Sequence, residues 1–338
     1  MLCQQLASPQ FTRPEEVVSH MGALQAQEYR LMRWAVSMRT RRPSASAFQK
    51  AYDSGRIIRL HLLRGTWQLV SGEDYRWMLA LCMPKARKVI EGWMSANSIH
   101  IPDEEYTRIR DLLVRCAADK GSVTKEDFAA ALAARDIRMD DHRLSYHIRM
   151  AELSGTLCSG NLHPSKATYA LTDTKVPAPS PLERDEALAL LARKYFRSHS
   201  PATLEDYVWW SGLSVSNCRR GIATLGNELH PVRWKESDYY LHEEARCRGF
   251  RRGSTILLPS YDEYLIGYKS RGLVLPEGHR HRAHNNSGIF YPVILCDGHV
   301  CGNWKPFARQ LSVELFEGTT PPPSLAAAWQ AYQAFQTR

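Results

Sequence analysis

The chain has 338 residues, of which 44% are hydrophobic and 23% are charged. A domain usually has roughly 100 to 200 residues, so this length predicts two or three domains. The composition is typical of a globular protein with a large core, and it excludes disordered and fibrous proteins. The 44 Lys and Arg against 35 Asp and Glu give a net charge of +9, which favours a polyanionic partner.

The sequence predicts a protein of the reducing cytoplasm, away from membranes. No apolar run approaches the roughly 20 residues that span a bilayer, and the start MLCQQLASPQ lacks a basic region followed by an apolar stretch. The eight cysteines include no C-x-x-C pair, so we expect free thiols. Cys296 and Cys301 flank Asp297-Gly298, a dipeptide typical of a hairpin turn. We interpret them as strand residues rather than as a disulfide or a metal site.

Three segments carry a Thr that is followed three residues later by an acid, a pattern that predicts a helix start with reciprocal capping. The pairs are Thr12 with Glu15, Thr124 with Asp127, and Thr203 with Asp206. After the third pair, a turn at Gly212 and a cap at Ser214 predict a second short helix, which is the order of a helix-turn-helix.

Strand-like runs follow the predicted helices in the first two segments. The first segment predicts a helix at 14–21, a longer helical stretch to about 38, and strands at 56–63 and 66–70. The second predicts helices at 125–135 and up to about 153, then strands at 156–158 and 167–171. Helix, helix, hairpin is the order of a winged helix. The uneven spacing of the segments indicates tandem duplication with divergence rather than a solenoid.

Composition shifts divide the rest of the chain. Pro177, Pro179 and Pro181 predict a linker. Beyond it, strands are expected at 255–258, 291–296 and 299–304, and a closing helix follows residue 324. We predict an α+β, mostly helical protein with three tandem winged-helix units and a small C-terminal β unit. The expected divisions are 1–120, 121–176, 177–250 (linker and third unit) and 251–338.

Basic residues gather in two stretches. Between residues 29 and 70, nine Lys and Arg stand against the single acid Asp53, and a second group begins at residue 246. A solitary Arg most often covers apolar surface with its stem. Clusters joined to a helix-turn-helix pattern favour phosphate binding instead. The expected contacts to double-stranded DNA are Arg39, Arg41, Arg42, Arg59, Arg64, Arg246, Arg248, Arg251, Arg252, Arg280 and Arg282.

The sequence predicts no metal and no cofactor. His279, His281 and His284, with Glu277 upstream, could suggest a metal site, but the interleaved arginines repel a cation and the spacing matches no standard zinc pattern. We interpret this run as a basic loop. Walker A, G-x-G-x-x-G, H-E-x-x-H and G-x-S-x-G motifs are absent. Among acids, Asp140 is expected to cap a helix, whereas Asp262 and Glu263 are either supporting carboxylates or a surface turn.

Two glutamines precede the first basic stretch, in GALQAQEYR at 22–30. Residues two apart share a face only in an extended segment. There, Gln25 and Gln27 would offer two carbonyl acceptors and two NH2 donors, enough to orient a water molecule. Taken alone, such a pair is more typical of two surface glutamines.

The chain resembles the AlkZ-type winged-helix DNA glycosylases of bacteria over nearly its whole length. The resemblance rests on GALQAQEYR, on LRGTWQLV at 63–70 with DYRWMLAL at 74–81, on the stretch at 184–213, on LLPSYDEYLIGYKSR at 257–271, and on PVILCDGHVCGNW at 292–304. It implies tandem winged helices around a C-shaped DNA cleft and a Gln-x-Gln active site, in which Gln25 and Gln27 match the two glutamines. A sister branch has Asp in the second place, and this sequence departs from it.

The resemblance further implies hydrolysis of the N-glycosidic bond of cationic N7-alkylated purines and the unhooking of interstrand crosslinks. Arg64, Thr66 and Trp67 of the first hairpin would then grip phosphates or fill a groove. Glu28 could assist as a hydrogen-bond acceptor, although in an extended run it would point to the face opposite that of Gln27. The alternative is a non-catalytic winged-helix regulator that reads DNA with residues 214–224, including Arg219 and Arg220. Because we find no clear dimerisation helix in the sequence, we expect a monomer, located at the nucleoid.

Overall fold

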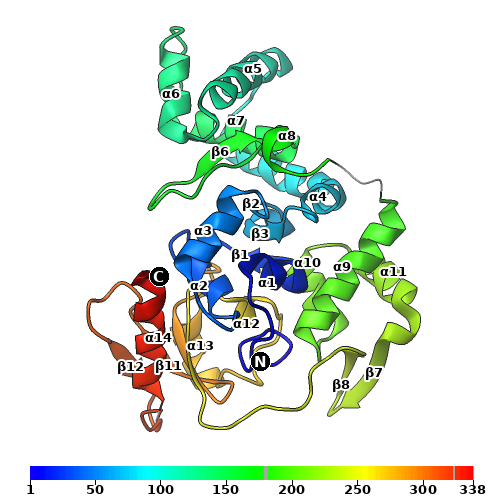
Figure 1. The fold of residues 1–338 in the computed structure, drawn as a ribbon. Helices are drawn as coiled ribbons and strands as arrows, with labels where there is room; N and C mark the ends of the chain where they lie inside the picture. Colours follow the sequence, from blue (N-terminus) through cyan, green and yellow to red (C-terminus); the bar gives the residue numbers. More distant parts are fainter. Residues whose placement is uncertain (179–181, 323, 338) are drawn as a thin grey trace. The chain divides into compact units, whose positions relative to one another are not determined.

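A computed structural model describes residues 1–178, 182–322 and 324–337. Two compact units make up the chain: unit 1 is Met1–Phe48 with Leu188–Arg338, and unit 2 is Gln49–Ala187 (Figure 1). Part of the predicted linker, residues 179–181, lies outside the described residues. Within the described ranges, no helix combines the length and apolarity that crossing a membrane requires.

The order helix, short strand or bridge, helix, helix, hairpin occurs three times along the chain. The first series is α1 (Pro14–Met21), β1 (Leu24–Gln25), α2 (Met32–Ser37), α3 (Ala45–Asp53), β2 (Ile57–His61) and β3 (Trp67–Ser71). The second is α5 (Asp103–Lys120), β4 (Val123–Thr124), α6 (Lys125–Ala133), α7 (Asp141–Leu153), β5 (Leu157–Ser159) and β6 (Thr168–Leu171). The third is α9 (Arg184–His199), a bridge from Ala202 to Tyr240, α10 (Leu204–Ser211), α11 (Val215–Leu225), β7 (Leu229–Trp234) and β8 (Ser237–His242). Each series closes with antiparallel strands.

Two of the three predicted helix starts are confirmed. In both capping boxes the Thr hydroxyl accepts from the acid's N–H, and the carboxylate accepts from the Thr N–H: Asp127 N–H lies 3.2 Å from Thr124 Oγ1, and Asp206 N–H lies 3.1 Å from Thr203 Oγ1. The pairing of Thr12 with Glu15 is wrong. The main-chain N–H groups of Thr12 and Arg13 instead donate to Glu16, because the N-cap of this helix is Arg13 and not Thr12.

Unit 1 is organised around a sheet with the strand order β12-β11-β10-β9. Its strands are β9 (Thr255–Leu258), β10 (Val293–Cys296), β11 (His299–Trp304) and β12 (Val313–Leu315), and α14 (Leu325–Thr337) packs beside them (Figure 1). The apolar core joins this sheet to α2, since Trp34 donates its indole N–H to Leu257 O at 2.8 Å. Asp297 and Gly298 both have positive φ and form the predicted turn, and the flanking cysteines are free.

Unit 2 has its own core between α5, α6, α7 and the three-stranded sheet β4-β6-β5. Phe128, Ile109 and Leu157 are fully buried there. The long helix α4 (Tyr75–Ala96) precedes this series, and the short helix α8 (Thr172–Lys175) follows it. Asp140 caps α7 as predicted, because its side chain accepts from Arg143 N–H at 2.9 Å.

The longer helical stretch expected before residue 38, in unit 1, is only the six residues of α2.

Candidate active site

The segment that carries Gln25 leaves α1 through a sharp turn. Gly22 ends α1 with a φ of 76°, and a Cβ at this position would lie 3.1 Å from Lys194 Cβ of α9. Only glycine meets both demands without strain. The chain then enters β1, so Gln25 lies in an extended segment as expected, and it bends again from Gln27. Gln25 is 5% exposed whereas Gln27 is exposed, so the two amides differ in their access to solvent.

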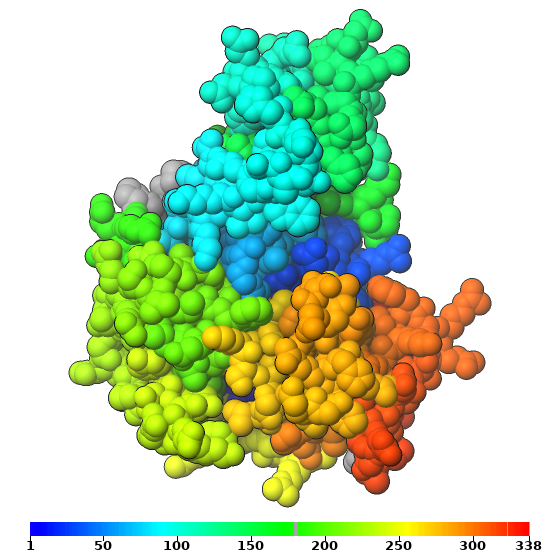
Figure 2. All heavy atoms as spheres, turned by 180° about the vertical axis from the view of Figure 1, so that it is seen from behind, coloured from blue at the N-terminus to red at the C-terminus, as the bar shows by residue number. Residues whose placement is uncertain are grey.

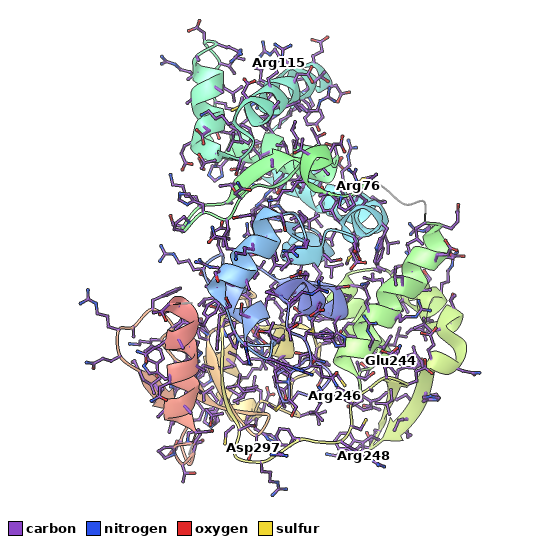
Figure 3. All side chains as sticks on the ribbon, in the orientation of Figure 1. Arg76, Arg115, Glu244, Arg246, Arg248 and Asp297 are labelled. Carbon is purple, nitrogen blue, oxygen red and sulfur yellow. The ribbon has the colours of Figure 1, made fainter. Side chains whose placement is uncertain are left out.

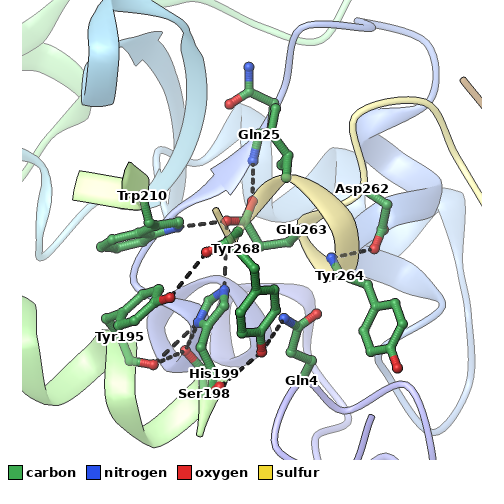
Figure 4. Close-up of polar contacts among 12 residues, drawn as sticks. Gln4, Gln25, Tyr195, Ser198, His199, Trp210, Asp262, Glu263, Tyr264 and Tyr268 are labelled. Carbon is green, nitrogen blue, oxygen red and sulfur yellow. Dashed lines mark hydrogen bonds and ion pairs between the residues drawn. The ribbon is translucent and has the colours of Figure 1, made fainter. Parts of the chain in front are cut away.

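The carboxylate of Glu263 holds the main chain of Gln25 (Figure 4). Gln25 N–H donates to Glu263 Oε2 at 3.1 Å, and Trp210 Nε1–H of α10 donates to Oε1 at 2.6 Å. His199 Nε2, at the end of α9, lies 3.6 Å from the same Oε1. Glu263 begins the short helix α12 (Glu263–Ile266), and the side-chain amide of Gln25 points away from it. Four segments of unit 1 therefore meet at one buried carboxylate.

Asp262, the neighbour of Glu263, binds Arg39 with both oxygens. The two N–O distances are 2.9 Å, and the two side chains are 1% and 0% exposed. Arg39 also donates to Ala35 O and Gln4 O. The prediction that Arg39 contacts DNA is therefore wrong: its guanidinium is enclosed and its donors are used inside unit 1. Asp262 and Glu263 are both buried, so the alternative of a surface turn is wrong.

Aromatic rings enclose this polar cluster. His199 stacks on Tyr195 with ring centroids 4.5 Å apart, and Tyr268 and Trp210 lie 5.6 and 5.8 Å from it. Tyr268 donates its hydroxyl to His199 O at 2.9 Å and accepts from Gln4 Nε2. Burial raises the pKa of both the Tyr195 and Tyr268 hydroxyls well above the ordinary range. These tyrosines are hydrogen-bond donors and not acid–base groups at neutral pH.

The hairpin β2–β3 of unit 2 carries several of the predicted DNA contacts. Arg59 is 4% exposed, and its guanidinium lies 3.6 Å from the ring centre of Trp67, so its assignment as a DNA contact is also wrong. Trp67, Arg64 and Thr66 are half-buried at the hairpin turn. Arg64 has a φ of 57°, and Thr66 donates to Leu63 O at 3.0 Å.

Most of the other predicted DNA contacts lie on the surface of unit 1. The exposed ones are Arg41, Arg42, Arg248, Arg251, Arg252 and Arg280. Arg246 and Arg248 lie on the segment that joins β8 to β9, and Arg246 is half-buried because it donates to Ser8 O at 2.9 Å (Figure 3). Arg282 is half-buried and pairs with Glu314. Arg246 and Arg282 therefore also fasten neighbouring segments. On the face in Figure 2, the residues of α9 to β8 lie beside those that follow β9.

The histidine run and Glu28 have local roles in the structure. His279 stacks on Phe316 with ring centroids 4.4 Å apart, and His284 stacks on Phe290 at 5.0 Å. Their imidazoles pack against the core of unit 1. Glu28 is half-buried, and its carboxylate accepts from Arg30 N–H at 3.1 Å.

Sequence reasoning missed His199, Trp210, Tyr268 and Gln4, which complete the cluster around Glu263. Their contacts join residues 53 to 264 positions apart, so no local pattern marks them. One signal was available. His199, Trp210 and Tyr268 lie in the two stretches, 184–213 and 257–271, on which the family resemblance rests.

The sequence matches one family of DNA glycosylases over most of its length. The model of the family described as DNA glycosylase AlkZ-like matches residues 18–336, and the chain belongs to this family of DNA glycosylases.

A sequence relative and a solved structure, both from Streptomyces sahachiroi, cover almost the full chain. The interstrand DNA cross-link repair glycosylase of Streptomyces sahachiroi is 25% identical over an alignment of 340 positions that covers 94% of this chain and 88% of that protein. The solved structure of the Streptomyces sahachiroi DNA glycosylase AlkZ superposes with a TM-score of 0.76 at 21% identity, over 99% of this chain and 94% of that one. This second likeness shows that the two folds agree.

Proposed function

We propose that this glycosylase hydrolyses the N-glycosidic bond of cationic N7-alkylated purines in double-stranded DNA, with a water molecule placed by Gln25 and Gln27. The observation that carries the proposal is the setting of this pair. Gln25 is anchored through its main chain inside unit 1, while Gln27, two residues on, is open to solvent.

The chemistry suits two neutral amides. An N7-alkylated purine already bears a positive charge, so it leaves C1′ without a general acid. The remaining tasks are to hold the water and to stabilise the oxocarbenium-like sugar, and fixed carbonyl dipoles can do both. An amide takes up no proton at neutral pH, so an undamaged purine should be a very poor substrate.

The same proposal includes the DNA-binding surface. The three helix-helix-hairpin series would act as tandem winged helices around a DNA cleft. Of the expected divisions 1–120, 121–176, 177–250 and 251–338, the first two would meet before α5 (Asp103–Lys120), since this helix opens the second series. Exposed arginines such as Arg41, Arg42 and Arg251 would bind phosphates. The name of the Streptomyces sahachiroi relative extends the proposal to interstrand crosslinks. We expect a monomer that works in the cytoplasm, at the nucleoid, without a metal or a cofactor.

Single-turnover release of N7-methylguanine from a duplex tests the proposal. Gln25→Ala and Gln27→Ala should each lower the rate by about 100-fold, the effect of losing one preorganised dipole, while the Kd for duplex DNA changes little. Gln49→Ala, at an exposed glutamine of α3, is the matched control and should keep the rate. A crosslinked duplex provides the second substrate.

A wild-type protein that binds duplex DNA but releases no base from either substrate would overturn the proposal. Binding of one preferred sequence, weakened by Arg219→Ala or Arg220→Ala in α11, would favour the non-catalytic regulator instead. Both arginines are exposed in the structure, so this outcome can be measured by footprinting.

A further inference from the structure

We propose that Glu263 is a positioning residue, which holds the Gln25 main chain in its catalytic place and is itself held by a hydrogen bond from Trp210, with the imidazole of His199 packed beside it. The catalytic part of this inference rests on the proposed function. Its structural basis is independent: the Glu263 side chain is 2% exposed, yet both of its oxygens receive donors from other segments. A buried carboxylate is costly unless it is paired and hydrogen-bonded, and this one is.

The hydrogen bonds around His199 determine where its protons lie. Its Nδ1 is 2.8 Å from Ser198 Oγ and 3.2 Å from Tyr195 O. Ser198 donates its hydroxyl proton to Lys194 O at 2.7 Å, and Tyr195 O can only accept, so Nδ1 carries a hydrogen. Nε2 then faces Glu263 Oε1 at 3.6 Å, which is too long for a hydrogen bond. The imidazole at the end of α9 therefore packs against Glu263 Oε1, and the hydrogen bond to that oxygen comes from Trp210.

The close approach of α9 and α12 is built into the sequence. A Cβ at Gly267 would lie 2.6 Å from Glu263 O and 2.9 Å from His199 Nε2, so a larger residue there would push the imidazole away from α12. Tyr261, just before the two acids, has a φ of 57°, which is strained for a bulky residue. Such strain persists only where the surroundings over-determine the chain. Here Arg39 holds Asp262, and hydrogen bonds from Gln25 and Trp210 hold Glu263.

These contacts fix the main chain of Gln25, and so the point from which its side chain extends. Its N–H is tied to Oε2, Oε2 belongs to a carboxylate held at Oε1 by Trp210, and α12 is held by the Arg39–Asp262 pair. Displacements of about 1 Å at a reacting group can slow catalysis by about 100-fold. Glu263 therefore acts on the reaction through Gln25, without contacting DNA.

Glu263→Gln is the decisive substitution. Its amide carbonyl can accept from only one of the two donors, and its NH2 must face the other, so either the Gln25 or the Trp210 hydrogen bond is lost. We expect the single-turnover rate to fall by about 10- to 100-fold with the Kd for duplex DNA unchanged. Glu277→Gln, at a side chain that is 83% exposed, is the matched control and should keep the rate.

A double-mutant cycle separates positioning from general damage to the fold. If Glu263 acts through Gln25, the Gln25→Ala/Glu263→Gln protein should be no slower than Gln25→Ala alone. Multiplied effects would overturn the inference, and so would a wild-type rate in Glu263→Gln. Trp210→Phe removes one donor and keeps an aromatic ring, and it should lower the rate about threefold to tenfold. It takes the place of Glu263→Gln in the same cycle if that variant does not fold.

Hydrogen exchange at the Gln25 amide tests the anchor without any activity. Exchange should be slow in the wild-type protein and about tenfold faster in Glu263→Gln, with no change in Glu277→Gln. Unchanged exchange in Glu263→Gln would refute the inference whatever the rates are. A protein with a protected Gln25 amide but no base release would refute the proposed function and leave this anchor standing.

Discussion

Each compact unit contains a two-point pair between an arginine and a carboxylate, and the two pairs differ in burial. In unit 1, Arg39 and Asp262 are 0% and 1% exposed. In unit 2, Arg143 and Glu105 are 28% and 21% exposed. Nη2 of Arg143 contacts one carboxylate oxygen of Glu105, and Nε lies 2.7 Å from the other. A partly exposed ion pair keeps contact with water and contributes little to the free energy of unfolding. A buried pair must stay intact, because either partner alone is an uncompensated charge. The enclosed pair is the one next to the candidate active site, where precise placement matters.

The largest expected effect comes from breaking the buried pair. Asp262→Asn leaves the Arg39 charge enclosed and should lower the free energy of unfolding of unit 1 by about 3 to 5 kcal/mol. Glu105→Gln should cost unit 2 about 1 kcal/mol or less, and added salt should shrink that difference. Hydrogen exchange of peptides from each unit measures the two free energies separately. Equal losses in the free energy of unfolding of both units would contradict the expected difference between the buried and the partly exposed ion pair.

The two capping boxes offer a sharper test, since their local geometry is the same. Thr124→Ala and Thr203→Ala should each cost about 1 kcal/mol. Asp206→Ala should cost more than Asp127→Ala, because Asp206 is 5% exposed and also accepts from the main-chain N–H of Lys269 at 2.9 Å, across unit 1. Asp127 instead pairs with the exposed Lys120. Thermal unfolding of the four variants decides the order, and matching losses for the two Asp variants would contradict it.

Acid should destabilise the two units over different pH ranges. Burial, with help from nearby cations, lowers the pKa of His20 in unit 1 from 6.5 to about 4. The folded state then binds fewer protons than the unfolded one, so stability is full above pH 6.5 and falls as the pH drops towards 4. Hydrogen bonds from Arg143 lower the pKa of Glu105 in unit 2 from 4.5 to about 2. Its contribution is present above pH 4.5 and is lost towards pH 2.

Variants at these two positions check the acid response. His20→Asn should flatten the pH dependence of unit 1 between 6.5 and 4, and Glu105→Gln should flatten that of unit 2 below 4.5. Hydrogen exchange, corrected for the intrinsic effect of pH, reports each unit. If His20→Asn changes the stability only below pH 4.5, the loss in that pH range does not come from Glu105.

Local patterns correctly predicted the elements that begin at a cap or close at a turn, because caps and turns are short-range. They gave no range for α3, α4, α5 or α9. Thr124, Thr203, Ser214 and Asp140 each bond to a main-chain N–H three residues ahead, so the sequence alone contains both partners. The one failed start is at Thr12. The spacing pairs Thr12 with Glu15, whereas the helix that begins at Pro14 has Arg13 as its N-cap and Glu16 as the capping acid.

The site was predictable only in part. The pair Gln25 and Gln27 came from the family resemblance, while charge alone led to wrong roles for Arg39 and Arg59. Charge density along a sequence is the same for a solvated and an enclosed arginine. What decided the role of Arg39 was Asp262, 223 residues away, and the role of Arg59 followed from the ring of Trp67 across its hairpin.

The sequence by itself determined the capped helix starts at Thr124, Thr203 and Ser214, the hairpins of the first two series, the turn at Asp297-Gly298, the free state of the cysteines and, through resemblance, the family. Only the tertiary structure decided which charges are enclosed and that Glu263 lies beneath Gln25. The physical reason is distance along the chain. Hydrogen bonds within a turn are encoded by neighbours, whereas the desolvation of a carboxylate depends on how β1, α9, α10 and α12 pack around it.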